Sequence, residues 1–249
     1  MSIYSFFELI DRCAFFIRYV QLPVPVFFCT HHHRIANTHD TLHNLKKARR
    51  RKTGCGGRKE ANMTENNRKL YIADTHFGHK NCIEFDNRPF SSVDEMEEIM
   101  CMNWNYVVRA EDTVYILGDF CFQVQGEWLR ILKLLNGQKI LIRGNHDPRE
   151  LHPAVAEQFA RVENYLEVAD GDRRVILSHY PILCYKNAMH ENCYMLYGHV
   201  HRTKDYDDVL RWTKEIKEER ANPWENRGQL YNVGCMLPYM YYTPRTLDQ

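Results

Sequence analysis

The chain has 249 residues, 44% of them hydrophobic, and a formal net charge of +1 at pH 7, which is typical of one globular domain with a substantial core. The charge is uneven, because the residues up to Asn62 hold 11 Lys/Arg against 4 Asp/Glu, whereas the rest holds 22 against 28, a net charge of −6. An acidic main body argues against broad electrostatic binding of nucleic acid and is compatible with an acidic pocket that holds a cation.

The nine cysteines are scattered along the chain and include no Cys-x-x-Cys pair. Most of those in the second part of the chain lie inside apolar segments, as small reduced hydrophobic residues do. The pattern indicates neither a disulfide framework nor a thiolate zinc site, so we expect a reducing, cytoplasmic location.

Residues 1–62 differ in composition from the rest of the chain. The apolar segment at 3–29 is interrupted by charged residues and two prolines, so it predicts neither a transmembrane helix nor a signal peptide. The histidine run 31–33 and the basic run 46–52 leave three functional interpretations open: a metal-binding tract, a nucleic-acid-binding arm and an interfacial helix.

We favour a fourth interpretation, which rests on coding. The residues Arg58-Lys59-Glu60-Ala61 can be encoded by codons that contain AAGGAGG, a bacterial ribosome-binding sequence, a few bases before the codon of Met63. The hypothesis is that 1–62 is an atypical extension, disordered or produced by an upstream mis-start, and that the domain proper spans 63–249.

From Lys69 onward, short apolar runs that predict buried strands alternate with segments of helical periodicity. A Ser-x-x-Glu capping box at Ser92 opens one helix, and Asn136-Gly137 is a typical end for another. This alternation is typical of a layered α/β fold. We predict strands at 70–73, 113–117, 139–142, 174–177, 194–197, 230–233 and 239–242, and helices at 93–109, 128–135, 148–161 and 207–220.

Five of the predicted strands end in side chains that bind metals. Each ending, taken singly, can be a turn or a satisfied core histidine. Five such endings in one chain are not explained in this way. Because ligands gather at the carboxyl ends of strands in α/β sheets, the five endings together predict one shared metal site. The residues are Asp74 and His76, Asp119, Asn145 and His146, His179, then His199 and His201.

The donors are oxygens and imidazole nitrogens without a thiolate, which suits Mn²⁺, Fe or Zn²⁺ better than a soft-metal ion. They are too many for one tetrahedral ion, so two ions bridged by a carboxylate are the economical solution. Two ions a few ångströms apart can hold phosphate oxygens and activate a water for in-line attack.

The blocks Asp-x-His, Gly-Asp, Gly-Asn-His-Asp, a lone His and Gly-His-x-His follow one another from Asp74 to His201. In this order of blocks the sequence resembles the calcineurin-like metallophosphoesterase family. The residues at 74–79 and 87–90 are similar to those of its small bacterial or phage phosphohydrolases. The resemblance implies an α/β four-layer sandwich, with two mixed β-sheets flanked by helices. The chain departs from the pattern at 120–123, where Phe-Cys-Phe-Gln replaces the second acidic residue of many members, which leaves the surroundings of Asp119 open.

The resemblance also implies roles for the individual residues. One ion would be bound by Asp74, His76, Asp119 and His201, and the other by Asp119, Asn145, His179 and His199. We expect Mn²⁺ as the first choice for both ions. A metal-bridging hydroxide would be the nucleophile. His146 would stabilise the phosphoryl oxygens or protonate the leaving group, and Asp147 would orient His146 by accepting its other N–H.

Four residues are weaker candidates for binding the substrate. Arg88, Asn81 and His79 follow the first metal block within reach of a phosphate, and the guanidinium fork of Arg88 suits one. Each can equally be an exposed loop residue. Tyr180 follows His179 and either lines the pocket or packs.

These features predict a metal-dependent phosphoric ester hydrolase that acts on a small phosphomonoester or phosphodiester. One alternative is a nuclease-type phosphodiesterase on DNA or RNA, which the acidic core disfavours. Another, of a different class, is a non-catalytic interaction module on the same fold, although that path usually erodes ligands that are intact here. A protein phosphatase would need a broader groove than this core offers. We expect no membrane partner, and the substrate and the oligomeric state stay open.

Overall fold

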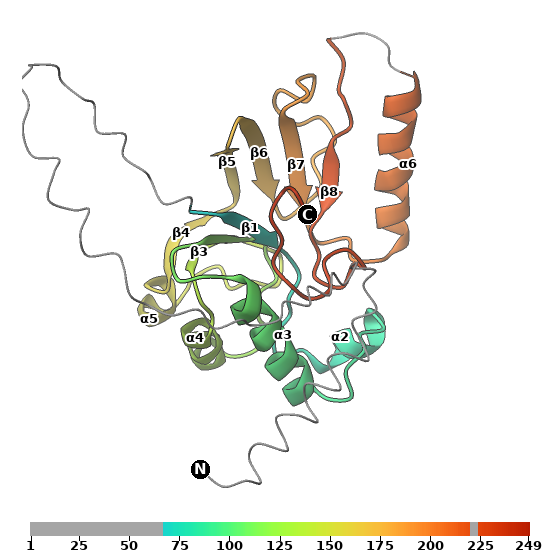
Figure 1. Cartoon of the computed structure of the whole chain (residues 1–249). Helices are drawn as coiled ribbons and strands as arrows, with labels where there is room; N and C mark the ends of the chain where they lie inside the picture. Colours follow the sequence, from blue (N-terminus) through green and yellow to red (C-terminus); the bar gives the residue numbers. More distant parts are fainter. Residues whose placement is uncertain (1–66, 220–223) are drawn as a thin grey trace, which may run out of the picture. The chain divides into compact units, whose positions relative to one another are not determined.

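The computed structural model describes residues 67–219 and 224–249, all within a unit that spans Ala61–Gln249. The extension predicted at 1–62 lies outside the described residues. The described part forms two four-stranded sheets, accompanied by helices (Figure 1). None of its helices has both the length and the apolar character needed to cross a bilayer.

The first sheet carries the first three predicted ligand loops. Its strand order is β1-β2-β3-β4, and every pairing is parallel. All four residues of β2 are buried, as expected for a continuous apolar run in a parallel sheet that is covered on both faces. The strands are β1 (Lys69–Ile72), β2 (Thr113–Ile116), β3 (Gln138–Ile142) and β4 (Phe159–Glu163).

The second sheet carries the remaining ligand loops and has the order β5-β6-β7-β8. Strand β5 runs antiparallel to β6, whereas β6, β7 and β8 are parallel, so this sheet is mixed. The predicted fold class is confirmed, with the difference that the four strands of the first sheet pair only in parallel. The strands are β5 (Tyr165–Asp170), β6 (Arg173–Ser178), β7 (Cys193–Tyr197) and β8 (Leu230–Asn232).

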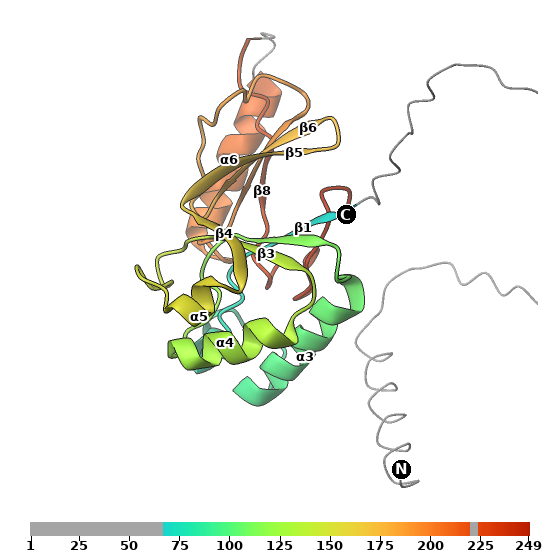
Figure 2. The same cartoon turned by 90° about the vertical axis from the view of Figure 1, so that its left-hand side faces the viewer.

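The helices cover the outer faces of the two sheets. Helices α3 and α4 lie along the first sheet and α6 along the second (Figure 2). The predicted N-cap is present, since the Ser92 hydroxyl accepts the N–H of Glu95 at 3.1 Å. The reciprocal half of the predicted capping box differs, because the Glu95 carboxylate accepts the backbone N–H of Ser91 at 2.6 Å and not that of Ser92. The helices are α2 (Lys80–Phe85), α3 (Val93–Val107), α4 (Gln125–Leu134), α5 (Pro153–Ala156) and α6 (Lys204–Glu219).

Strand β6 shows how the second sheet joins two cores. Val175 and Leu177 belong to the main cluster with the residues of the first sheet, whereas Ile176 belongs to the cluster that includes Val209 of α6. Alternate side chains of a strand point to opposite faces, so a continuous apolar run is needed here. Each such side chain stabilises the fold by about 1.5–3 kcal/mol through burial.

Two predicted elements are wrong. The segment 148–161 forms only the short helix α5 and then enters β4, because residues 159–163 pair with β3, which extends the first sheet. The segment 239–242 is a turn, since Tyr241 and Tyr242 have φ of 51° and 54°, outside the range of strands. The sequence patterns also gave no indication of α2 or β5.

Candidate metal centre

The predicted ligands lie in loops that leave the carboxyl ends of five parallel strands. Asp74, Asp119 and Asn145 follow β1, β2 and β3, while His179 follows β6 and His199 follows β7. The two sheets meet at these loops, because the backbone N–H of His199 donates to both carboxylate oxygens of Asp74 at 3.0 Å. The strand order thus places residues far apart in sequence at one edge of the fold.

The backbone of these loops is strained. Five of the seven predicted ligands have φ in the left-handed region, which is uncommon for residues other than glycine. Such conformations cost of order 1–3 kcal/mol each and tend to cluster at functional sites. The five are Asp74 (54°), His76 (47°), Asp119 (52°), His199 (70°) and His201 (45°).

Glycines allow the ligand loops to approach one another. A Cβ on Gly144 would lie 2.2 Å from Oδ1 of Asp119, and one on Gly118, whose φ is 84°, would lie 2.4 Å from Nδ1 of His179. Both positions therefore require glycine for space, and Gly118 also for its backbone conformation.

The ligand atoms form two groups with one carboxylate between them. The first group is Asp74, His76 and His201, and the second is Asp119, His179 and His199; within each, the atoms lie within 4.8 Å of one another. Oδ2 of Asp119 lies 3.6 Å from Nε2 of His76 and 3.6 Å from Nε2 of His179. Oδ1 of Asn145 lies 2.9 Å from Nε2 of His179. All seven predicted ligands are thus brought together.

The imidazole hydrogen bonds test whether these residues suit metal ions. Nδ1 of His179 lies 2.8 Å from the Leu117 carbonyl, which only accepts, so the neutral ring carries its proton there and turns the Nε2 lone pair towards the oxygen of Asn145. Two acceptors that face each other at 2.9 Å repel unless a cation lies between them. Ligands of one octahedral ion with bonds of ~2.1 Å are about 3 Å apart. The donor set therefore fits divalent ions.

The buried carboxylates and neutral imidazoles of the site also favour a bound cation. Burial raises the pKa of Asp74 to about 7 and also raises the pKa of Asp119, since two carboxylates are removed from water. Burial lowers the pKa of His76 to about 2 and lowers those of His179 and His199, which keeps these rings neutral, as metal ligands must be.

His201 is held by a residue that the sequence patterns did not reveal. Its Nδ1 lies 2.7 Å from Oδ1 of the buried Asp86. Burial alone lowers the pKa of His201, but the hydrogen bond to Asp86 and the charges of Asp74 and Asp86 outweigh it, so the pKa is raised. Asp86 leaves Nε2 of His201 free to face the first group, where Nε2 of His76 lies 3.3 Å away.

Arg88 is buried and does not face a substrate. Its guanidinium binds Asp86 at 2.9 and 2.8 Å and donates to the carbonyls of Thr75 and Asp74 at 2.9 and 3.0 Å. It therefore holds the loop of the first metal block, in place of the phosphate contact that we predicted. The guanidinium N–H groups that suggested a phosphate site are thus donated to two carbonyls and a carboxylate.

Asp147 also differs from its predicted role. Its Oδ2 accepts the backbone N–H of Asp119 at 3.0 Å and that of Gly144 at 2.8 Å, and its Oδ1 accepts that of Phe120 at 3.0 Å. No hydrogen bond joins Asp147 to the ring of His146 among the described residues, so Asp147 orders the loop of Asp119 instead of that ring. It supplies the acidic support for Asp119 that the sequence at 120–123 lacks.

The remaining candidates lie near the surface. His146 is exposed, with its ring 5.6 Å from that of His76, and its backbone N–H donates to Oδ1 of Asp119 at 2.8 Å. Tyr180 is 48% exposed, and its ring lies 4.6 Å from that of His199, which places it beside the second group. Asn81 is exposed on α2, and a substrate contact by either residue stays a prediction.

Comparison with known proteins shows the family to which the chain belongs. Residues 68–223 match the family model of the calcineurin-like phosphoesterase superfamily domain, and the chain belongs to this family. Membership of this family supports phosphoester hydrolysis as the class of reaction, and the family typically binds divalent metals. The resemblance of the motif blocks is thereby confirmed.

Individual relatives are similar over parts of the chain. An uncharacterised protein of Methanocaldococcus jannaschii is 51% identical over 83 residues, which cover 32% of this chain and 47% of that protein. The gene 66 protein of Mycobacterium phage L5 is 30% identical over 129 residues, 45% of this chain and 62% of its own length. The chain thus spans about half the length of these relatives. A solved structure, a protein of unknown function from Aquifex aeolicus, has a TM-score of 0.53 at 28% identity, covering 73% of this chain and 96% of that one.

Proposed function

We propose that the chain is a two-metal phosphoesterase that hydrolyses a small phosphomonoester or phosphodiester, with Mn²⁺ as the favoured ion and Fe or Zn²⁺ as alternatives. The observation that carries the proposal is the position of Asp119, whose Oδ2 is 3.6 Å from the nearest nitrogens of both His76 and His179. A carboxylate oxygen between two ligand groups is suited to bridging two ions.

The donor chemistry divides the residues between the two ions. Asp74, His76 and His201 would bind one and Asn145, His179 and His199 the other, with Asp119 shared. Bound in this way, two divalent ions lower the pKa of a water and stabilise charge on the phosphoryl oxygens.

His146 supports the catalytic part of the proposal. Its exposed ring lies beside His76, while its backbone is fixed to Asp119. An imidazole at the open side of the site can stabilise the phosphoryl oxygens or donate a proton to the leaving oxygen. Because Asp147 is occupied elsewhere, we assign the orientation of His146 to its backbone and to Phe122, whose ring lies 5.6 Å away.

The partner and the compartment are part of the same proposal. We favour a small ester over nucleic acid because 22 basic against 28 acidic residues after Asn62 disfavour a polyanion. All six cysteines in the described part are free thiols, which supports a reducing, cytoplasmic location.

The test is a hydrolysis panel with the full chain, stripped with chelator and reloaded with Mn²⁺. Substrates are p-nitrophenyl phosphate, bis-p-nitrophenyl phosphate, cyclic nucleotides and single-stranded DNA, with Asp119→Asn as the inactive control. We expect metal-dependent hydrolysis of at least one small ester by the wild type alone. Equal rates for both proteins over the whole panel would refute the proposed function.

A further inference from the structure

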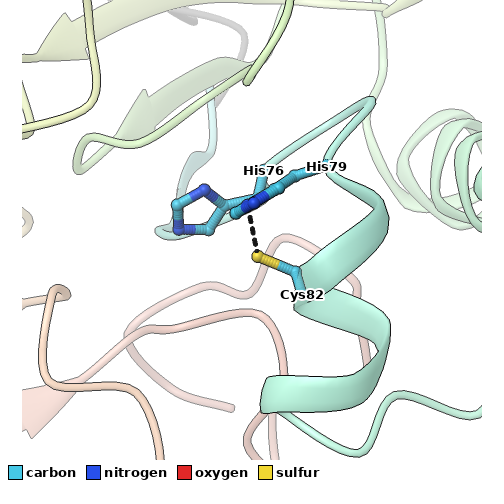
Figure 3. Close-up of side chains that lie close together, drawn as sticks. All are labelled: His76, His79 and Cys82. Carbon is cyan, nitrogen blue, oxygen red and sulfur yellow. Dashed lines mark hydrogen bonds between the residues drawn. The ribbon is translucent and has the colours of Figure 1, made fainter.

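His79 and Cys82 form a contact beside the centre that the seven ligands do not use. Sγ of Cys82 lies 2.8 Å from Nδ1 of His79 (Figure 3). His79 precedes α2 and Cys82 lies in its first turn, with the Cys82 N–H donating to the His79 carbonyl at 3.2 Å. This helical turn brings the two side chains together.

A third metal ion is the first explanation to consider, since donor atoms of His76, His79 and Cys82 lie within 4.8 Å of one another. Nε2 of His76, however, faces the first ligand group, which leaves only His79 and Cys82 as donors for such an ion. The contact between Sγ of Cys82 and Nδ1 of His79 has hydrogen-bond geometry. We therefore interpret the pair as a hydrogen bond and not as part of a metal site.

The direction of this hydrogen bond determines the tautomer of His79. An unprotonated imidazole nitrogen is a good acceptor, whereas a thiol sulfur is a weak one, so the thiol of Cys82 donates to Nδ1. Burial raises the pKa of Cys82 to about 12, which keeps the thiol protonated. The proton of the neutral imidazole then resides on Nε2.

The ring of His79 is also fixed in position. It stacks on Phe122 with ring centroids 3.9 Å apart and an interplanar angle of 17°. It lies 5.5 Å from the ring of His76, and Phe122 and His76 are the same two rings that flank His146. The side chain of His79 is partly exposed, and its Nε2 makes no hydrogen bond to the described residues.

We propose that His79 is a further substrate-binding residue, whose Nε2–H donates to an oxygen of the phosphoryl group that His146 also contacts. This inference rests on the proposed function, because it requires a phosphoryl group at the centre. An anionic oxygen is the acceptor that best matches a fixed neutral donor. Cys82 is a positioning residue, which acts by holding the proton on Nε2.

The test measures the affinity for inorganic phosphate of the full chain loaded with Zn²⁺, together with KM and kcat for bis-p-nitrophenyl phosphate. A hydrogen bond to a charged group is worth about 1.5–3 kcal/mol, so His79→Leu should weaken phosphate binding about 10- to 100-fold and raise KM. His79→Gln, whose amide can donate from a similar position, should recover much of the loss. Unchanged phosphate affinity in His79→Leu, or equal losses in both variants, would overturn the inference.

Cys82 is tested by a readout that a purely structural role would not move. Nitrogen-15 NMR of the zinc-loaded chain should show His79 protonated at Nε2 and bare at Nδ1. Cys82→Ala should mix the tautomers, and Cys82→Ser should restore the single one. A proton on Nδ1, or a metal-shifted Nδ1, in the wild type contradicts the proposed role of Cys82.

These measurements separate the two proposals. Phosphate affinity that depends on His79 in a protein that hydrolyses no ester would refute the proposed function and leave His79 as an anion-binding residue. Hydrolysis by the wild type, with phosphate affinity unchanged in His79→Leu, would refute only this inference. Failure of the wild type to bind phosphate at all would also refute it.

Discussion

Asp86 and His201 are joined by a hydrogen bond of 2.7 Å between Oδ1 and Nδ1. The second oxygen of Asp86 binds Arg88, which in turn holds the carbonyls of Asp74 and Thr75. This series of hydrogen bonds, from His201 through Asp86 to Arg88, therefore connects a candidate ligand after the second sheet with the first metal block. Such contacts fix the tautomer and raise the basicity of a ligating histidine.

Asp86→Asn is expected to weaken binding of one ion by about 10- to 100-fold, the usual effect of losing a carboxylate behind a ligating histidine. The asparagine keeps the shape but not the charge. Calorimetric titration with Mn²⁺ measures the change, and Asp94→Asn on the exposed start of α3 is the matched control. Equal Mn²⁺ affinity in the two variants would show that Asp86 does not support His201.

Asp119→Asn should be the most damaging change among the ligands, because both groups lose a shared carboxylate at once. The metal content, measured by inductively coupled plasma mass spectrometry, should fall from about two ions per chain towards one or none. A variant that keeps both ions and full activity would rule out the bridging role.

His146→Ala should retain the metal content and thermal stability of the wild type, since the exposed ring is outside the core. We expect kcat to fall by about a hundred- to ten-thousand-fold, the range of a general acid or charge stabiliser. The loss should be smaller for bis-p-nitrophenyl phosphate, whose leaving group hardly needs a proton, than for an alkyl ester. Equal losses for both would leave only charge stabilisation, and loss of an ion would make His146 a ligand.

Asp147→Asn should act on stability before it acts on chemistry. The side chain accepts three backbone N–H groups, and an amide leaves at least one of them without an acceptor. The free energy of unfolding should fall by about 1–3 kcal/mol, measured by urea unfolding of the full chain. Unchanged stability with a large loss of kcat would instead support the role that the sequence suggested, orientation of His146.

The gathering of the seven candidate ligands at one edge could be predicted from sequence because each follows an apolar strand within four residues. A strand, a turn and two metal-binding side chains follow one another within a few positions at 139–142, Gly144, Asn145 and His146. Parallel pairing of the strands then brings such loops together. The same locality explains why strands β1, β2 and β3 and the capped helix α3 were predicted nearly in full.

The contacts behind the ligands could not be predicted, because they depend on tertiary packing. Arg88 and Asp86 are two residues apart, and only the fold shows that they are buried behind the centre and join His201. Strand β4 was missed for a similar reason, since its pairing with β3 outweighs a locally helical sequence. Asp147 follows the predicted pattern, yet its partners are backbone groups that no side-chain motif reveals.

Anomalous diffraction from crystals of the full chain grown with Mn²⁺ tests the central claim most directly. The account predicts two peaks about 3.5–4 Å apart, one among Asp74, His76 and His201 and the other among Asn145, His179 and His199, with the carboxylate of Asp119 between them. A single peak, or two peaks that lie away from these residues, would contradict it.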